Sequence, residues 1–166
     1  MSKNETTGLG RELLLTSRRR MLEEYFPRLQ RCCEELSDQD VWWRADERGN
    51  SVGNLVLHLN GNIRQWIVCG LGGAQDSRDR QQEFDERRII SRSELLSKFE
   101  ATLIEAGGVI DSFDENNLLE VRRIQQWDVT YLEAILHVVE HFAQHLGQII
   151  YITKLRTGRD LKFYDL

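Results

Sequence analysis

Apolar residues recur at helical spacing in four stretches of the chain, at about residues 9–36, 52–69, 92–113 and 131–156. In each stretch they fall three or four positions apart, which places them on one face of an α-helix. The alternation of apolar and polar residues that is typical of strands is rare. The pattern predicts an all-α fold, a four-helix bundle in which a long crossover joins the second and third helices.

Local signals mark where these helices begin and end. Pro27 should kink or restart the first helix, because proline cannot continue the helical hydrogen bonds. Capping-box patterns at 91–94 and 130–133 open the third and fourth helices, and Gly158 closes the fourth. The turn-like stretch GLGGAQDSRDRQQEFDERR supplies the crossover. We therefore expect one helical bundle domain over residues 1–166.

The composition is that of an ordinary acidic protein, with 40% hydrophobic and 30% charged residues and a net charge of −5. Non-specific nucleic-acid binding needs a field of Lys and Arg, so no nucleic-acid partner is expected. No apolar run reaches the roughly 20 residues that cross a membrane, and the N-terminus does not resemble a secretion signal. We expect a cytoplasmic protein without a membrane partner, whose Cys32, Cys33 and Cys69 are reduced.

Three of the four histidines, His137, His141 and His145, stand at a spacing of four on the last predicted helix. Neighbours on this ladder lie about 5–6 Å apart and can share a metal ion, but its ends are roughly 12 Å apart. Two ligand pairs are therefore possible. The pair 137/141 with Glu140 spells the H-x-x-E-H of one class of zinc peptidase. That site also needs a carboxylate from well downstream, where only a short tail remains.

A helical wheel favours the other pair. It places His145 well inside the apolar arc and His141 at its edge. His137 lies further out, among polar residues that include Glu133. We expect His137 to be a neighbour of the site, either bonded to Glu133 or in contact with the ligands.

The remaining histidine, His58, faces the bundle from the second helix and is the candidate third ligand. Three imidazoles from two helices, without thiolates, suit Zn²⁺, Ni²⁺ or a similar ion and leave one position open. Such an ion lowers the pKa of a bound water or thiol, so that a nucleophile exists at neutral pH.

Other polar residues near these histidines are candidate helpers. Asn62 and Gln148 each lie about one turn after a candidate ligand, and either catalysis or packing between helices explains them. The crossover residues Arg78, Arg80 and Glu83 either line the mouth of a pocket or belong to a solvated loop.

The segments NSVGNLVLHLNGNIRQW (50–66) and HVVEHFAQHLGQIIYITKL (137–155) resemble the DinB/YfiT-like superfamily, and the resemblance extends over nearly the whole chain. It implies a helical bundle whose metal site combines one histidine of the second helix with an H-x-x-x-H pair on the last core helix. His58, His141 and His145 match those positions.

The resemblance implies several activities. Some members transfer bacterial low-molecular-weight thiols to electrophiles or use such a thiol to isomerise a substrate, and others are regarded as metal-dependent hydrolases. The arginine that usually follows the last histidine is Leu146 here, which counts against thiol transfer. We expect a metal-dependent enzyme acting on a small-molecule substrate or thiol, as a thiol S-transferase or as a hydrolase. A non-catalytic metal-binding bundle is the competing class.

Members of this superfamily are often homodimers, and the resemblance implies the same here. Trp42 and Trp43, in a polar loop region, are one candidate for the interface. Burial against the end of the bundle is the alternative.

Overall fold

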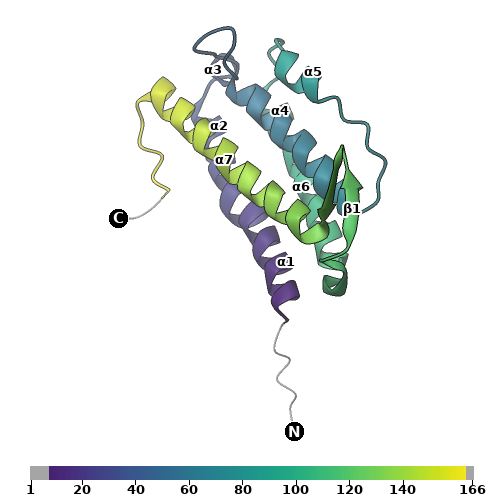
Figure 1. Cartoon of the computed structure of the whole chain (residues 1–166). Coiled ribbons are helices and arrows are strands. Elements are labelled where there is room, and N and C mark those ends of the chain that lie inside the picture. Colours follow the sequence, from purple (N-terminus) through teal and green to yellow (C-terminus); the bar gives the residue numbers. More distant parts are fainter. Residues whose placement is uncertain (1–7, 164–166) are drawn as a thin grey trace.

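The computed structural model of the chain describes residues 8–163. Four long helical segments run alongside one another (Figure 1). They are α1 (Leu9–Arg19) continued by the π-helical η1 (Arg20–Tyr25) and α2 (Phe26–Glu35), then α4 (Val52–Ile63) continued by the π-helical η2 (Arg64–Leu71), then α6 (Arg92–Ser112), and finally α7 (Tyr131–Thr157). The helical stretches expected from the sequence are confirmed.

Shorter elements complete the chain, so a plain four-helix bundle describes only part of it. They are α3 (Asp38–Val41), α5 (Arg80–Asp85), the 3₁₀ turn η3 (Glu115–Asn117), and the antiparallel strands β1 (Val121–Ile124) and β2 (Trp127–Thr130). The strand pairing runs from Val121 opposite Thr130 to Ile124 opposite Trp127. The prediction of an all-α fold missed this hairpin. Its strands have four residues each, and within β1 only Ile124 is buried, so the sequence shows no alternating pattern that would predict them.

The helix ends follow the local signals in the sequence. Pro27 is the second residue of α2, and α2 directly follows the π-helical η1, so the helix is restarted there. Thr130 and Glu133 form a full capping box at the start of α7, while Ser91 accepts a hydrogen bond from the Glu94 amide at the start of α6. Gly158 ends α7 with a φ of 65°, a conformation that glycine adopts without steric cost.

Apolar side chains from all four long segments fill the centre. Phe142 of α7 stands edge-on to Phe99 of α6 and to Tyr25 of η1, with ring centroids 5.4 Å apart in each pair. Each fully buried large apolar side chain stabilises the fold by about 1.5–3 kcal/mol.

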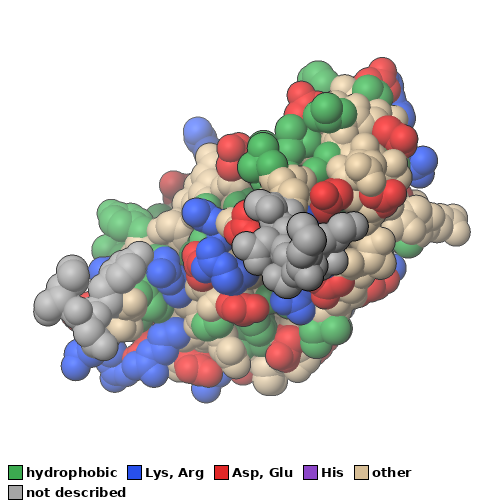
Figure 2. Space-filling view, turned by 90° about the horizontal axis from the view of Figure 1, so that it is seen from below, with side chains coloured by type: hydrophobic (Ala, Val, Ile, Leu, Met, Phe, Trp, Pro, Cys, Tyr) green, Lys and Arg blue, Asp and Glu red, His purple; other side chains and the backbone are tan. Residues whose placement is uncertain are grey.

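On the lower face basic and acidic side chains are interspersed (Figure 2). Exposed ion pairs contribute at most about 1 kcal/mol each. Stability therefore rests mainly on the core.

Trp42 is buried, and its Nε1 donates a hydrogen bond of 2.8 Å to the Ile90 carbonyl. Trp43 is half-buried, with the Arg156 guanidinium 4.8 Å from its ring centre. Burial against the protein itself is therefore the correct alternative for Trp42, and a homodimer stays a prediction. Cys32, Cys33 and Cys69 are all free thiols.

No helix within residues 8–163 is long and apolar enough to span a membrane.

The contact between Gly53 and Trp42 gives a test of the packing. A Cβ at position 53 would lie 2.8–2.9 Å from three atoms of the Trp42 ring. Gly53→Val should lower the free energy of unfolding by about 1–3 kcal/mol, because the ring must move out of a close-packed site. Gly108 has open space around its Cβ position, so Gly108→Ala should raise stability by up to about 1 kcal/mol. Urea unfolding measures both, and an unchanged Gly53→Val midpoint would contradict this packing.

Candidate metal centre

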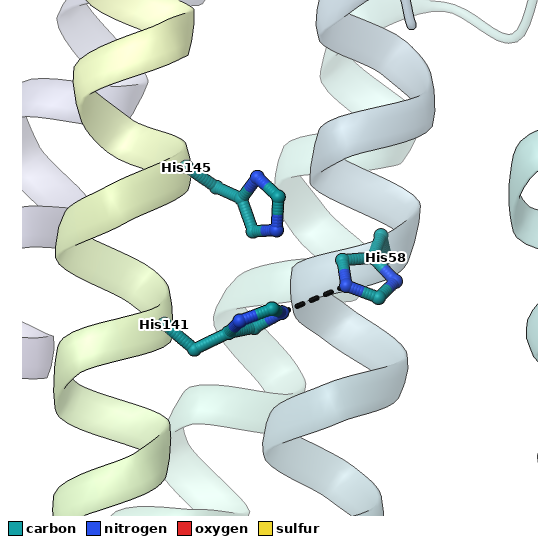
Figure 3. Close-up of side chains that lie close together, drawn as sticks. All are labelled: His58, His141 and His145. Carbon is teal, nitrogen blue, oxygen red and sulfur yellow. Dashed lines mark hydrogen bonds between the residues drawn. The ribbon is translucent and has the colours of Figure 1, made fainter.

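Three histidines converge between α4 and α7. His58 comes from α4, and His141 and His145 come from successive turns of α7 (Figure 3). Each offers a ring nitrogen within 4.8 Å of the other two. The Nε2 atoms of His58 and His141 are 2.7 Å apart. The structure thus brings together the three residues that the sequence selected.

Burial in this cluster differs from the helical-wheel expectation. His58 is only 3% exposed, whereas His137, His141 and His145 are all half-buried. The wheel placed His145 well inside the apolar arc and His137 furthest out, but this gradient is not visible in their burial. The wheel measures the distance of a residue from the centre of the apolar face, but the cluster lies beside that face, where α7 meets α4. His58 is the most buried of the four histidines because the crossover packs against it.

Hydrogen bonds at the outer ring nitrogens orient two of the histidines. His58 Nδ1 lies 3.0 Å from Glu83 Oε2, and His145 Nδ1 lies 2.9 Å from Gln148 Oε1. An ionised carboxylate and an amide oxygen can only accept, so these two contacts favour the tautomers with the proton on Nδ1. The Nε2 lone pairs are then free to bind a cation, which is the usual arrangement of metal-binding histidines.

The electrostatics favour neutral imidazoles. Burial lowers the pKa of His141 to about 3, with further lowering by His145 and His58. Burial also lowers the pKa of His145, against the opposing effect of the Gln148 hydrogen bond. At neutral pH both rings are therefore in the unprotonated form that metal binding requires. Among residues 8–163 no carboxylate or thiol joins the three-histidine group as a fourth donor.

Gln148, a candidate catalytic residue, has a positioning role in this structure. Besides holding His145, it lines a groove of about 520 Å³ between α7 and the start of α4. The groove is uncharged and is formed by Asn50, Leu55, Gln144, Gly147, Gln148, Tyr151 and Ile152. The groove adjoins the centre through Gln148, whose Oε1 lies 2.9 Å from His145 Nδ1.

Asn62, the other candidate, is buried beside the centre and contacts His137. Its Nδ2 lies 3.1 Å from His137 Nε2. His137 also packs against Trp66, with ring centres 4.2 Å apart, and stacks on His141 at 5.3 Å. The pairing of His137 with Glu133 is wrong, since Glu133 caps the start of α7. The alternative, contact with a ligand histidine, is what the structure shows.

The crossover takes a larger part in the centre than the sequence indicated. Arg78 and Glu83 do not belong to a solvated loop, because their side chains are 6% and 11% exposed and lie against His58. Both line a cavity of about 590 Å³, as the pocket alternative expected. Arg80 is exposed, with its guanidinium 4.9 Å from the centre of the Phe84 ring. Phe84, which sequence reasoning missed, lies 4.6 Å from the His58 ring. The four-residue spacing of Arg80 and Phe84 would have indicated this pair had the segment been recognised as helical.

Similar folds are found among solved bacterial structures. A conserved protein from Enterococcus faecalis matches with a TM-score of 0.69 and 16% identity, covering 93% of this chain and 98% of its own. A DinB-like protein from Bacillus cereus ATCC 10987 matches with a TM-score of 0.66 and 12% identity, covering 82% and 88% respectively. No curated protein matches the chain. At these identities the likeness concerns the fold alone, a helical fold that the chain shares with the DinB-like protein.

Within that class, the chain belongs to DUF1572, a family of proteins of unknown function, whose sequence profile matches residues 9–165. This family match and the fold shared with a DinB-like protein together support the resemblance to the DinB/YfiT-like superfamily. The family description assigns no activity, so function must be argued from the site.

Substitution of each histidine tests the ligand set. His58→Ala, His141→Ala and His145→Ala should each lose most bound metal, because two remaining imidazoles hold an ion poorly. His137→Ala should keep nearly full metal content, since its Nε2 faces Asn62. Elemental analysis of the four purified variants gives the stoichiometries. Retention of metal by His145→Ala together with its loss from His137→Ala would support the peptidase-like pair instead.

The low pKa of His141 predicts how the metal-free protein responds to acid. The folded-state pKa of about 3 lies below the ordinary value of 6.5, so the unfolded chain takes up the proton first as the pH falls. The free energy of unfolding is therefore unaffected by His141 above about pH 6.5. Between about pH 6.5 and pH 3 protonation of this residue in the unfolded chain lowers that free energy by up to about 1.4 kcal/mol per pH unit. Urea unfolding between pH 7.5 and 5 should show the decline, and His141→Asn should reduce it. An equal decline in the variant would exclude His141 as its source.

Proposed function

We propose that this protein is a metal-dependent enzyme in which His58, His141 and His145 hold a divalent transition ion, Zn²⁺ or Ni²⁺, beside a small-molecule groove. The observation that carries the proposal is the convergence of three ring nitrogens within 4.8 Å from two different helices. Imidazole nitrogens without thiolates are the ligand type that both ions accept. Three protein ligands are typical of catalytic sites, whereas structural zinc sites are closed by four.

The side chains around the centre have separate roles in this proposal. Glu83 and Gln148 fix the tautomers of His58 and His145. Phe84 covers the His58 ring and limits the access of water from the crossover side. The bound ion supplies Lewis acidity, which lowers the pKa of a coordinated water or thiol.

Thiol S-transfer is the activity we propose first, and Arg80 supports it. Leu146 is buried in the apolar core, so it offers no cation to the site. Arg80 lies over Phe84 next to the centre and has no ion pair or hydrogen bond to the part of the chain between residues 8 and 163. Burial is the main cause of the lowered pKa of His145, and the charges of His58 and Arg80 lower that pKa further, so the Arg80 charge acts at the site. A positive charge in this place favours a thiolate or an anionic thiol cosubstrate.

Hydrolysis is the second candidate, favoured by the uncharged groove beside His145. The side-chain amides of Asn50, Gln144 and Gln148 can donate to and accept from an ester or amide substrate. Glu83 is not free to act as a general base besides the metal-activated nucleophile, because it is paired with Arg78 and bonded to His58. Hydrolysis would therefore depend mainly on the nucleophile that the ion activates.

Activity assays on metal-loaded protein separate these candidates. Zinc- or nickel-loaded protein should conjugate one of a panel of bacterial thiols to monobromobimane, and EDTA should abolish the reaction. Arg80→Gln should lower kcat/KM for an anionic thiol by about tenfold, the value of one charge-assisted interaction. The matched control is Arg123→Gln, which removes an exposed arginine paired with Asp128 on the hairpin.

Each alternative gives a different result in the same assays. Ester or amide cleavage without thiol transfer would favour the hydrolase. Loaded protein that is inactive throughout the panel would favour the non-catalytic bundle, and activity that survives EDTA would contradict a role for the metal.

A further inference from the structure

One face of α4 and η2 carries a polar stripe directed at the crossover between α4 and α6, residues 72–91. The stripe consists of the polar residues Asn54, His58 and Gln65 together with Gly61, at spacings of four, three and four, which places them on one side of the helix. Asn54 Nδ2 donates 2.8 Å to the Glu83 carbonyl, and Gln65 Nε2 donates 2.6 Å to Asp76 Oδ2. The stripe therefore holds the crossover against α4 by hydrogen bonds, although the crossover contains only one short helix, α5.

The centre of this docking is a buried ion pair. Arg78 Nε lies 2.7 Å from Glu83 Oε1, and Arg78 Nη2 lies 2.7 Å from Glu83 Oε2. The same guanidinium donates to Gln65 Oε1 at 2.9 Å and to the His58 carbonyl at 3.3 Å. A bidentate pair with these further bonds has little freedom to move. The Arg78–Glu83 pair is thus held rigidly against the helix that carries His58.

The Arg78–Glu83 pair selects one state of the His58 ring. His58 Nδ1 lies 3.0 Å from Glu83 Oε2 and 3.1 Å from Arg78 Nη2. A proton on Nδ1 gives a charge-assisted bond to the carboxylate, while Arg78 Nη2 keeps its bonds to Glu83 and to the His58 carbonyl. This tautomer leaves the Nε2 lone pair directed at His141. It is the only neutral tautomer of His58 that can bind a metal through Nε2.

Gly61, one turn after His58, makes the close approach possible. A Cβ at this position would lie 1.9 Å from Glu83 Oε1 and 2.7 Å from Arg78 Nε. Any larger residue would push the Arg78–Glu83 pair away from the helix and from His58. The glycine therefore has a specific structural reason in the middle of a helix, where glycine otherwise costs about 1 kcal/mol.

We propose that the Arg78–Glu83 pair is a positioning pair of the metal centre, and that metal binding and docking of the crossover stabilise each other. The inference rests on the proposed three-histidine metal site. By thermodynamic linkage, a pair that strengthens metal binding through His58 must itself be held more firmly when the metal is bound. Both side chains also line a cavity of about 590 Å³ on the crossover side of α4. Metal binding then stabilises one wall of that cavity.

The test compares Glu83→Gln and Gly61→Ala with wild type and with Glu35→Gln. Glu35 is a matched control, since its side chain is also 11% exposed and pairs with arginines, Arg31 and Arg159, away from the histidines. Zn²⁺ affinity is measured by chelator competition. The protonated nitrogen of His58 is read from ¹⁵N NMR, and the protection of residues 72–91 with and without Zn²⁺ is read from hydrogen exchange.

In wild type, Zn²⁺ should protect the crossover, and His58 should carry its proton on Nδ1. Glu83→Gln and Gly61→Ala should each lower Zn²⁺ affinity by about 10–100-fold and reduce the Zn²⁺-dependent protection. Glu35→Gln should stay within about twofold of wild type. Affinity and protection in both site variants equal to those of wild type would overturn the positioning role. Wild-type protein that binds no Zn²⁺ would instead refute the proposed function on which it rests. If Glu83→Gln does not fold, Gly61→Ala, which keeps both charges, decides the question.

Discussion

The close approach of two imidazoles between α4 and α7 is the constraint on which the site depends. The Nε2 atoms of His58 and His141 face each other at 2.7 Å, and at most one proton can lie between them. Two cationic rings at that distance, with His58 almost fully buried, would be strongly unfavourable. The arrangement is stable only with neutral rings, and a third imidazole, His145, adds to the same requirement. A divalent cation satisfies such a cluster better than a single shared proton does.

Much of the surrounding structure follows from keeping these rings neutral and oriented. Glu83 and Gln148 accept hydrogen bonds from the outer nitrogens of His58 and His145. Glu83 can be buried as a carboxylate because Arg78 neutralises it. The crossover that carries both residues is docked by the polar stripe on α4, and Gly61 leaves the space they need. A connection between two helices has thus become part of the centre.

The sequence was sufficient to locate the long helices and the three histidines that the structure brings together. Helical periodicity and caps such as Thr130 located the four long segments within a few residues, and spacing limited which rungs of the histidine ladder could share an ion. The hairpin at 121–130 escaped detection because its strands are too short to show a period. The π-helical segments η1 and η2 have no sequence signal that distinguishes them from α-helix. The positions of Glu83 and Phe84 depend on how the crossover folds back onto α4, which single-sequence patterns do not specify.

The central claim is that one divalent ion sits among His58, His141 and His145. Anomalous diffraction at the zinc edge from crystals of the zinc-loaded protein tests it most directly. The account predicts one strong peak at about 2.0–2.1 Å from the Nε2 atoms of all three residues. A peak bound instead by His137 and His141, or no peak between α4 and α7, would contradict it.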